Sequence, residues 1–290
     1  MMSMAETLLK WAGGKAKIAD DIIDTLDVLN NRRFVEPFAG GAATTFRART
    51  RGFTGRVWLN DLSIGLINFW TAVQLDPVGV SNAVEIIDAI YFNAWQEDVD
   101  HAERLYYVNR TELNIALRDD VQDLNHFAAL WLTINKWGFN GLWRCNRKGE
   151  CNVPWGKRYA RLPNLEEIQT VSTALTRTRI TNIQANQCIV ECGEGDTGLV
   201  DPPYEAEFAG YTGAAQWGAT ERNELLDCMA LAAARGARLL LTNRYSPELA
   251  EACTSRGGVV EAWQERVSIN RDGGGRGLRD TVGVLFKRDS

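Results

Sequence analysis

Short apolar runs alternate with helical stretches along most of this chain. Four runs have the length of buried strands, and two more near the carboxyl terminus have the pattern of a hairpin. The predicted strands are 34–37, 57–60, 199–201 and 239–242, and the predicted hairpin joins 259–267 to 281–287. Because strands alternate with helices, we predict an α/β protein with a mostly parallel sheet covered by helices.

The alternation stops between about 76 and 165. Helical patterns cover 80–95, 102–117 and 127–135, and a glycine- and asparagine-rich basic stretch follows them. We interpret 76–165 as an inserted, mainly helical domain that ends in a basic hairpin at 136–161. The flanking segments 1–75 and 166–290 would then form one sheet domain.

Charge changes this picture, because it is unevenly distributed. The chain has a formal net charge of −5, yet 136–161 holds seven basic side chains against Glu150 alone. The segment 85–123 holds ten acidic residues against three arginines. A basic patch on an acidic body is compatible with steering a phosphate backbone, although a solvated charged loop explains the charge equally well.

Composition excludes several classes of protein. No stretch approaches the roughly 20 apolar residues of a membrane span, and the first residues contain no apolar signal region, so we expect a cytoplasmic protein without membrane contact. The six cysteines form no CxxC motif and the chain has only two histidines. Reduced structural thiols are therefore expected rather than a metal site.

The most informative motif is Asp201-Pro202-Pro203-Tyr204, which directly follows the apolar run 198–200. In open α/β sheets, ligands bind at the carboxyl ends of the strands. The two prolines lack N–H donors, so the turn presents carbonyl acceptors and one carboxylate. Such a turn suits an exocyclic amino group held by Asp201 and the Pro202 carbonyl, with Tyr204 stacked on the ring. A plain proline-rich turn is the alternative.

A second motif lies in the first seventy residues. The strand 34–37 runs into Gly40 and Gly41, and Asp61 stands twenty residues further on, at the end of the next strand. Glycines allow a ligand to approach the backbone, and an acid at that spacing can accept hydrogen bonds from ribose hydroxyls. The pattern lacks GxGxxG, so an adenosyl cofactor without phosphates fits better than NAD. The segment 10–15 lacks P-loop spacing.

Together, the segments LLKWAGGK, FVEPFAGGAA, LND, FNGLWRCNRKGECNVPWG and DPPY, in this order, resemble the Dam-type, alpha-group (D12 class) DNA adenine-N6 methyltransferases. The resemblance covers nearly the whole chain. It implies a Rossmann-like class I S-adenosylmethionine-dependent methyltransferase sheet with an inserted, mainly helical target-recognition domain. It also implies double-stranded DNA as the partner, base flipping of the target adenine, and no metal.

The resemblance assigns residues to three roles. The catalytic turn would be Asp201, Pro202, Pro203 and Tyr204. The cofactor would be bound by Trp11, Lys15, Glu36, Phe38, Gly40, Gly41, Asp61 and Asp201. The DNA would be contacted by Lys10, Lys136, Phe139, Asn140, Leu142, Arg144, Asn146, Lys148, Pro154 and Arg158.

Within the DNA set, Arg144 matches a guanine-reading arginine, with a phosphate contact as the alternative. Lys10 matches a lysine on the first guanine of the site, and Leu142 and Pro154 match positions that contact bases through apolar atoms. Phe139 would fill the gap left by a flipped base, or would be a core aromatic. GATC is the leading target sequence.

Two segments depart from the family pattern, one at the expected cofactor site and one at the expected DNA contact. Gln184 and Ala185 stand where the family often has an acid and an aromatic against the cofactor adenine, and Arg158 stands where a tyrosine is expected. RNA or protein-glutamine N-methylation, and a catalytically inactive DNA-binding module, remain as alternatives. A cognate restriction endonuclease, as in restriction-modification, stays open as a partner, and a monomer is the simplest expectation.

Overall fold

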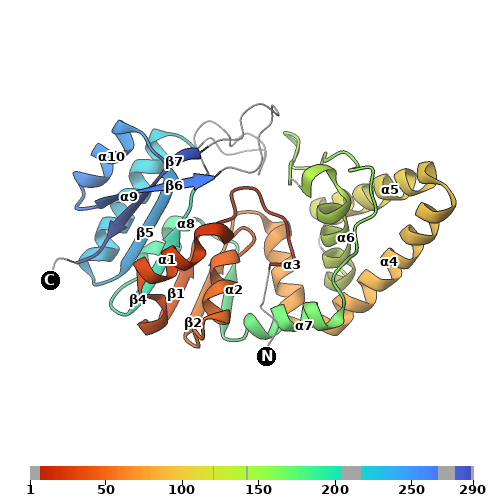
Figure 1. Cartoon of the computed structure of the whole chain (residues 1–290), viewed down its shortest axis with the longest axis horizontal. Helices are drawn as coiled ribbons and strands as arrows, with labels where there is room; N and C mark the ends of the chain where they lie inside the picture. The colour runs from red at the N-terminus through yellow and green to blue at the C-terminus, as the bar shows by residue number, and fades with distance from the viewer. Residues whose placement is uncertain (1–6, 120, 142, 204–216, 267–277, 289–290) are drawn as a thin grey trace. The chain divides into compact units, whose positions relative to one another are not determined.

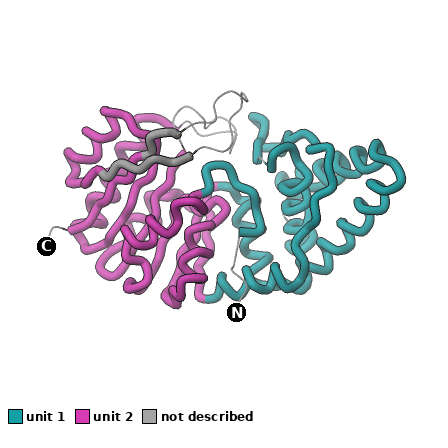
Figure 2. Tube along the Cα trace, viewed as in Figure 1, with its two compact units in different colours: residues 1–14, 63–176, 209–215 teal, residues 15–62, 177–208, 216–290 magenta. Residues whose placement is uncertain are grey.

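The computed structural model describes residues 7–119, 121–141, 143–203, 217–266 and 278–288, with helices and strands placed as in Figure 1. These residues divide into two compact units (Figure 2). The helical unit contains 7–14 and Ser63–Thr176, and the sheet unit contains Lys15–Leu62 with the described residues after Thr176.

The sheet unit is built on seven strands. In chain order these are β1 (Arg33–Glu36), β2 (Arg56–Asn60), β3 (Thr178–Thr181), β4 (Asp196–Val200), β5 (Arg238–Arg244), β6 (Val259–Arg266) and β7 (Leu278–Phe286). Their order in the sheet is β3-β2-β1-β4-β5-β7-β6. The first five are parallel, and β7 lies antiparallel between β5 and β6. Strand order therefore reverses between β1 and β4, where open α/β sheets bind ligands.

The strand predictions at 34–37, 57–60, 199–201 and 239–242 are confirmed as β1, β2, β4 and β5, and the terminal hairpin is confirmed as β6 and β7. Strand β3 was missed. Its sequence, Thr-Arg-Ile-Thr, contains one apolar residue and lies at the sheet edge, so it lacks the continuous apolar run of a central strand.

Helices cover both faces of the parallel strands. They are α1 (Ala19–Leu26), α2 (Ala43–Thr50), α8 (Ala185–Val190), α9 (Ala219–Ala234) and α10 (Pro247–Thr254), with 3₁₀ turns at Ala16–Ile18 and Val28–Asn30. Val35 of β1 and Val200 of β4 pack with α8, α9 and α10 in one buried cluster. On the other face, the Thr197 hydroxyl donates to the Leu26 carbonyl at the end of α1 (3.0 Å).

The helical unit consists of five α-helices among its described residues. They are α3 (Ile64–Leu75), α4 (Pro77–Glu97), α5 (Val99–Arg118), α6 (Leu124–Trp137) and α7 (Leu165–Ala174), with a 3₁₀ turn at Phe139–Gly141. Ten of the fourteen residues of α6 are buried, so α6 is the centre of this unit. The helical predictions at 80–95, 102–117 and 127–135 are confirmed as α4, α5 and α6.

Aspartates define where the three longest helices of this unit begin. Asp76 accepts a hydrogen bond from the Gly79 N–H, and Pro77 occupies the first turn of α4. Asp98 caps α5 and Asp123 caps α6 in the same way. Each carboxylate satisfies an N–H group that the helix leaves without an internal partner. None of the helices in the described ranges is long and apolar enough to span a membrane.

Candidate active site and nucleic-acid interface

Asp201 lies directly after β4, at the point where strand order reverses. Its Oδ2 is 2.7 Å from the Lys15 Nζ, and its Oδ1 accepts a hydrogen bond from the Thr242 hydroxyl at 2.8 Å. Thr242 belongs to the neighbouring strand β5 and is fully buried. The Lys15 side chain is 4% exposed and that of Asp201 is 19% exposed. The carboxylate is therefore held from two sides and still reaches solvent.

Glu36 ends β1, the neighbour of β4, and is buried. Its Oε2 accepts hydrogen bonds from the backbone N–H and the hydroxyl of Thr45, in the first turn of α2. Burial raises the pKa of Glu36 to about 7; the Thr45 hydrogen bonds oppose this shift and the Asp201 charge adds to it. The Glu36 carboxyl therefore keeps its proton to a higher pH than an exposed glutamate does.

The glycine turn after β1 is fixed by the end of β2. The Gly40 N–H donates to the Asp61 Oδ2 at 3.0 Å, and the Ala39 N–H donates to the Asn60 carbonyl at 2.8 Å. Gly40 has a φ of 49°, in the left-handed region that glycine adopts most readily. Asp61 is therefore held beside the turn, as its position in the sequence predicted.

Asn60 is a residue that the sequence analysis missed. Its buried side-chain amide donates to the carbonyls of Pro37 (3.0 Å) and Ile183 (2.9 Å), and its Oδ1 accepts from the Ile183 N–H (3.0 Å). One side chain thereby joins the turns that follow β1 and β3. The sequence signal that could have found it is an amide residue directly after an apolar run, because such a residue must find hydrogen-bond partners when it is buried.

Three partly buried apolar side chains lie together at the same edge. Phe38, Ile183 and Trp217 all pack on the buried cluster beneath α8 and α9. The rings of Phe38 and Trp217 meet edge to face, with their centroids 5.7 Å apart. Trp217, just before α9, was not among the predicted site residues. The edge thus combines carboxylates with aromatic surface that remains partly exposed.

In the helical unit, residues 144–152 form a short hairpin. The Asn146 N–H donates to the Glu150 carbonyl (2.9 Å) and the Asn152 N–H donates to the Arg144 carbonyl (3.1 Å). Asn146 also accepts hydrogen bonds from the backbone N–H groups of Lys148 and Glu150. Its side chain therefore builds the turn of the hairpin.

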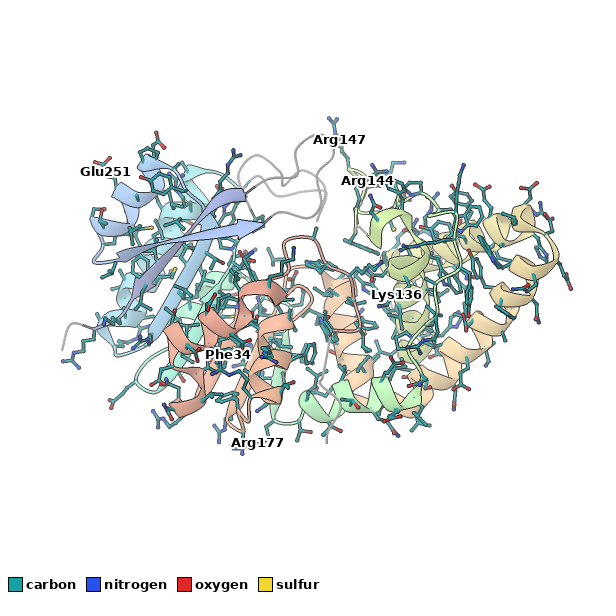
Figure 3. The ribbon with its side chains drawn as sticks, viewed as in Figure 1. Phe34, Lys136, Arg144, Arg147, Arg177 and Glu251 are labelled. Carbon is teal, nitrogen blue, oxygen red and sulfur yellow. The ribbon has the colours of Figure 1, made fainter. Side chains whose placement is uncertain are left out.

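Arg144 is exposed on one arm of the hairpin. Its Nε donates to the Asn152 Oδ1 at 2.7 Å, and a terminal nitrogen donates to the Asn152 carbonyl at 3.0 Å. Figure 3 shows Arg144 and Arg147 on this hairpin and Lys136 on α6. Lys148 and Pro154 are exposed as well. The arginine fork is thus oriented by its own hairpin and accessible to a partner.

Polar side chains of α5 hold the hairpin from behind. The Asn114 amide donates to the Cys151 carbonyl (3.0 Å) and its Oδ1 accepts from the Cys151 N–H (2.7 Å). Arg110 and Tyr106 both donate to the Val153 carbonyl. The sequence analysis placed these residues in a helix and did not predict that they support the hairpin. The hairpin is therefore anchored to α5 through the backbone of Cys151 and Val153.

Lys10 lies against the end of α6. Its backbone N–H and carbonyl both bond to the buried Asn135 side chain, at 2.9 and 2.7 Å. Lys136 is adjacent in sequence, and Arg158 donates to the Lys136 carbonyl at 3.2 Å. Burial lowers the pKa of Lys136, and the Lys10 charge lowers it further; burial and the Arg158 charge lower the pKa of Lys10. Three cations thus share one region of this unit.

The remaining predicted residues are placed as follows. Phe139 is 52% exposed, which is inconsistent with a position in the core, and Asn140 is exposed beside it with a φ of 56°. Trp11 is partly exposed in the helical unit, Gly41 and Pro202 are buried, and Pro203 is partly buried. Tyr204 and Leu142 lie outside the described residues. No group of three or more metal-binding side chains occurs in the described part of the chain.

The parallel order β3-β2-β1-β4-β5, with its reversal between β1 and β4, defines a Rossmann-like, doubly wound α/β fold, and β7 adds an antiparallel strand to it. The model of the D12 class N6 adenine-specific DNA methyltransferases matches residues 11–267. The chain belongs to this family.

Individual proteins are also similar to this chain. The "DNA N-6-adenine-methyltransferase" of Escherichia phage P1 is 30% identical over 97% of this chain, and the chain spans 35% of that protein's length. The "DNA adenine methylase" of Vibrio cholerae is 26% identical, over 98% of this chain and 97% of its own length. Among solved structures, TrmN from Thermus thermophilus has a TM-score of 0.41 and 14% identity, over 94% of this chain and 49% of that one.

Proposed function

We propose that this protein methylates N6 of adenine in double-stranded DNA, with S-adenosylmethionine as the methyl donor. The observation that carries the proposal is the Asp201 carboxylate, which Lys15 and Thr242 orient at the switch point of the sheet. Family membership supplies the substrate class. The sheet unit would perform the chemistry, and the helical unit would recognise the DNA target. The helical unit is larger than the predicted domain 76–165, because 7–14, 63–75 and 166–176 also belong to it.

The residues at the carboxyl edge fit an adenosyl cofactor. Asp61, held beside Gly40, offers a carboxylate to ribose hydroxyls, and the partly exposed rings of Phe38 and Trp217 offer apolar contact to a purine. The Asp201 carboxylate, and Glu36 when it is ionised, would favour the positive charge of a sulfonium. Lys15, Gly41 and Trp11 complete the proposed set. When bound, the cofactor supplies an activated methyl group on sulfur.

Asp201 is suited to hold the amino group of the target base. Each carboxylate oxygen has two acceptor sites, so Oδ2 can accept from the substrate amine while it keeps its bond to Lys15. The Pro202 carbonyl would accept the second amine hydrogen, with Pro203 stiffening the turn and Tyr204 stacking on the ring. When both hydrogens are held, the nitrogen can become pyramidal, and its lone pair is then no longer delocalised into the ring. Positioning and preorganised charge then lower the barrier.

The hairpin at 144–152 is suited to the major groove of DNA. Arg144 presents a fork that matches the O6 and N7 acceptors of guanine, and Asn152 already orients it. Exposed Phe139 would fill the gap left by a flipped adenine. The target would be GATC, read by Arg144 and Lys10, with Leu142 and Pro154 on neighbouring bases. The set of backbone contacts would be Lys136, Asn140, Asn146, Lys148 and Arg158.

The proposal extends to the setting of the enzyme. It would act as a monomer, because one chain supplies both a carboxylate site and a DNA-reading hairpin. It would act in the cytoplasm. A cognate restriction endonuclease would be its partner if it belongs to a restriction-modification pair. A host that tolerates the nuclease gene only when this gene is present would support that pairing.

Methyl transfer in vitro tests the proposed function. Purified protein is incubated with labelled S-adenosylmethionine and a duplex oligonucleotide, with the matching RNA duplex and a protein substrate as competitors. We expect label only in the DNA, on N6 of adenine. Label in RNA or protein would contradict the proposed substrate. DNA binding without any transfer would identify a binding module instead.

A further inference from the structure

Two cysteines face each other across the hairpin that carries Arg144. Cys145 and Cys151 form an antiparallel bridge. The flanking hydrogen bonds run from the Asn146 N–H to the Glu150 carbonyl and from the Asn152 N–H to the Arg144 carbonyl. This pattern makes Cys145 and Cys151 a non-hydrogen-bonded pair, in which Cα atoms are about 4.5 Å apart. Disulfides span Cα separations of about 4.4–6.8 Å, so the backbone already meets this requirement.

The environment of the pair is compatible with a bond between the thiols. Directly opposite residues project from the same face of a hairpin, so both side chains lie on one side of it. Both are buried, with 9% exposure for Cys145 and 2% for Cys151, and both are reduced in this structure. Cys145 is the more accessible of the two.

The sheet unit contains an internal comparison. Cys188 and Cys192 are also buried, and the Cys192 thiol donates to the Cys188 carbonyl at 3.4 Å, one helical turn away. Burial raises the pKa of both thiols to about 12. Cys188 lies in α8 and Cys192 lies two residues past its end, so no β-bridge places them opposite each other as it places Cys145 and Cys151. Burial is matched between the two pairs, and backbone geometry differs.

We propose that Cys145 and Cys151 form a thiol–disulfide site that reacts with low-molecular-weight disulfides of the glutathione class. The Cys145 thiolate attacks one sulfur of oxidised glutathione and releases one glutathione thiolate. The Cys151 thiolate then attacks the Cys145 Sγ and releases the second. Two protons and two electrons leave the protein, one S–S bond forms in it, and two molecules of glutathione are produced.

Burial sets the rate of this reaction. It raises the pKa of Cys145 to about 12 and that of Cys151 to about 11, so the reactive thiolates are scarce in the closed hairpin. Reaction therefore proceeds when the hairpin opens, and equilibrium is reached slowly. DNA bound to the hairpin would slow it further.

The site would regulate DNA binding, a consequence that rests on the proposed function. Arg144 precedes Cys145, and its guanidinium bonds to Asn152, which follows Cys151. A disulfide would hold the two arms of the hairpin at one fixed separation. Because docking in a DNA groove requires the hairpin to adjust its shape, we expect oxidation to weaken DNA binding several-fold.

Peptide mapping of the full chain tests the site. The protein is equilibrated with excess oxidised glutathione, the remaining thiols are alkylated, and the digest is analysed by mass spectrometry. We expect a Cys145–Cys151 link with the loss of two hydrogen atoms, and alkylated Cys188 and Cys192. Cys145→Ser and Cys151→Ser should abolish the link, and Cys188→Ser should keep it. Alkylated Cys145 and Cys151, or links distributed among all six cysteines, would overturn the proposal.

DNA affinity of the same samples tests the regulation. Oxidised wild-type protein should bind duplex DNA several-fold more weakly than reduced protein, and the Cys145→Ser, Cys151→Ser double variant should not respond to oxidation. Equal affinity of linked and reduced protein would overturn the regulatory role. Reduced protein that binds no DNA would contradict the proposed function alone, because the mapping result does not depend on DNA.

Discussion

The carboxyl edge of the sheet and the hairpin of the helical unit both use charged side chains, but these are buried at the edge and exposed on the hairpin. At the sheet edge, Lys15 and Glu36 are buried, and their partners come from neighbouring strands and helices. On the hairpin, Arg144 is exposed, and the hydrogen bonds that stabilise the region lie behind it, from Asn114 and Arg110. Chemistry requires charges fixed in place, whereas reading a polymer requires exposed side chains on a rigid base.

The largest expected effect separates the two regions at Asp201. Asp201→Ala should lower methyl transfer by about 10³-fold or more, since it removes the acceptor of the amine, and it should leave DNA affinity within about twofold. Single-turnover transfer and DNA titration measure the two effects.

Asp196 is a matched control on the same strand. It begins β4 and pairs with Arg33 at 2.7 Å, at the opposite end from Asp201. Asp196→Ala should lower stability and keep the rate per folded molecule. Equal losses of transfer in both variants would show that the strand, and not the placement of Asp201, matters.

Glu36 gives the sheet edge a pH dependence. Its pKa is raised in the folded state to about 7, above its usual 4.5, so folded protein retains a proton that unfolded protein releases. The resulting stability is present at low pH and is lost as pH rises from about 4.5 to about 7, by on the order of 3 kcal/mol. Glu36→Gln cannot ionise and should lack this loss.

Urea denaturation of both proteins between pH 4 and pH 8 measures this effect, with pH values chosen to bracket the two pKa values. The stability of Glu36→Gln relative to wild type should rise through that window and level off above pH 7. A constant difference between the two proteins would show that Glu36 does not titrate there.

Arg144 should determine the DNA affinity and sequence specificity of the hairpin. Arg144→Ala should weaken binding to the cognate duplex by about 1–3 kcal/mol, roughly 5- to 150-fold, and relax specificity at one guanine. Arg147, exposed on the same hairpin, is the matched control, and Arg147→Ala should weaken all duplexes by a similar, smaller factor. If Arg144→Ala weakens every sequence equally, Arg144 contacts a phosphate.

The smallest expected effect tests whether Asn114 supports the hairpin. Asn114→Ala removes both hydrogen bonds to the Cys151 backbone and should destabilise the helical unit by about 1–2 kcal/mol. DNA affinity should fall modestly, and cofactor affinity should not change. Calorimetry with S-adenosylhomocysteine and DNA titration give the two affinities. A loss of cofactor affinity would contradict the separate roles of the two regions.

Residue order alone predicted much of the sheet edge, because the carboxyl ends of parallel strands must meet along one line. Asp61 and Asp201 each follow an apolar run, and each lies where that rule predicts. The bond from Lys15 to Asp201 was not predictable in this way. It joins residues 186 positions apart, and no local pattern encodes that pairing.

The polar supports were missed for a related reason. Asn60, Asn114 and Asn135 lie inside apolar or amphipathic segments, and each serves the backbone of a distant turn. A hydrophobic pattern counts such residues as exceptions, although burial requires them to have partners. Asn135, within the apolar helix α6, was the strongest signal of this kind.

Mapping N6-methyladenine in genomic DNA tests the central claim most directly. The gene is expressed in a host without adenine methylation, next to its Asp201→Ala variant, and the DNA is read by single-molecule sequencing. The account predicts methylated adenine at one short motif containing guanine, GATC in the leading case, and none with the variant. Folded, cofactor-binding protein that leaves every adenine unmethylated would contradict it.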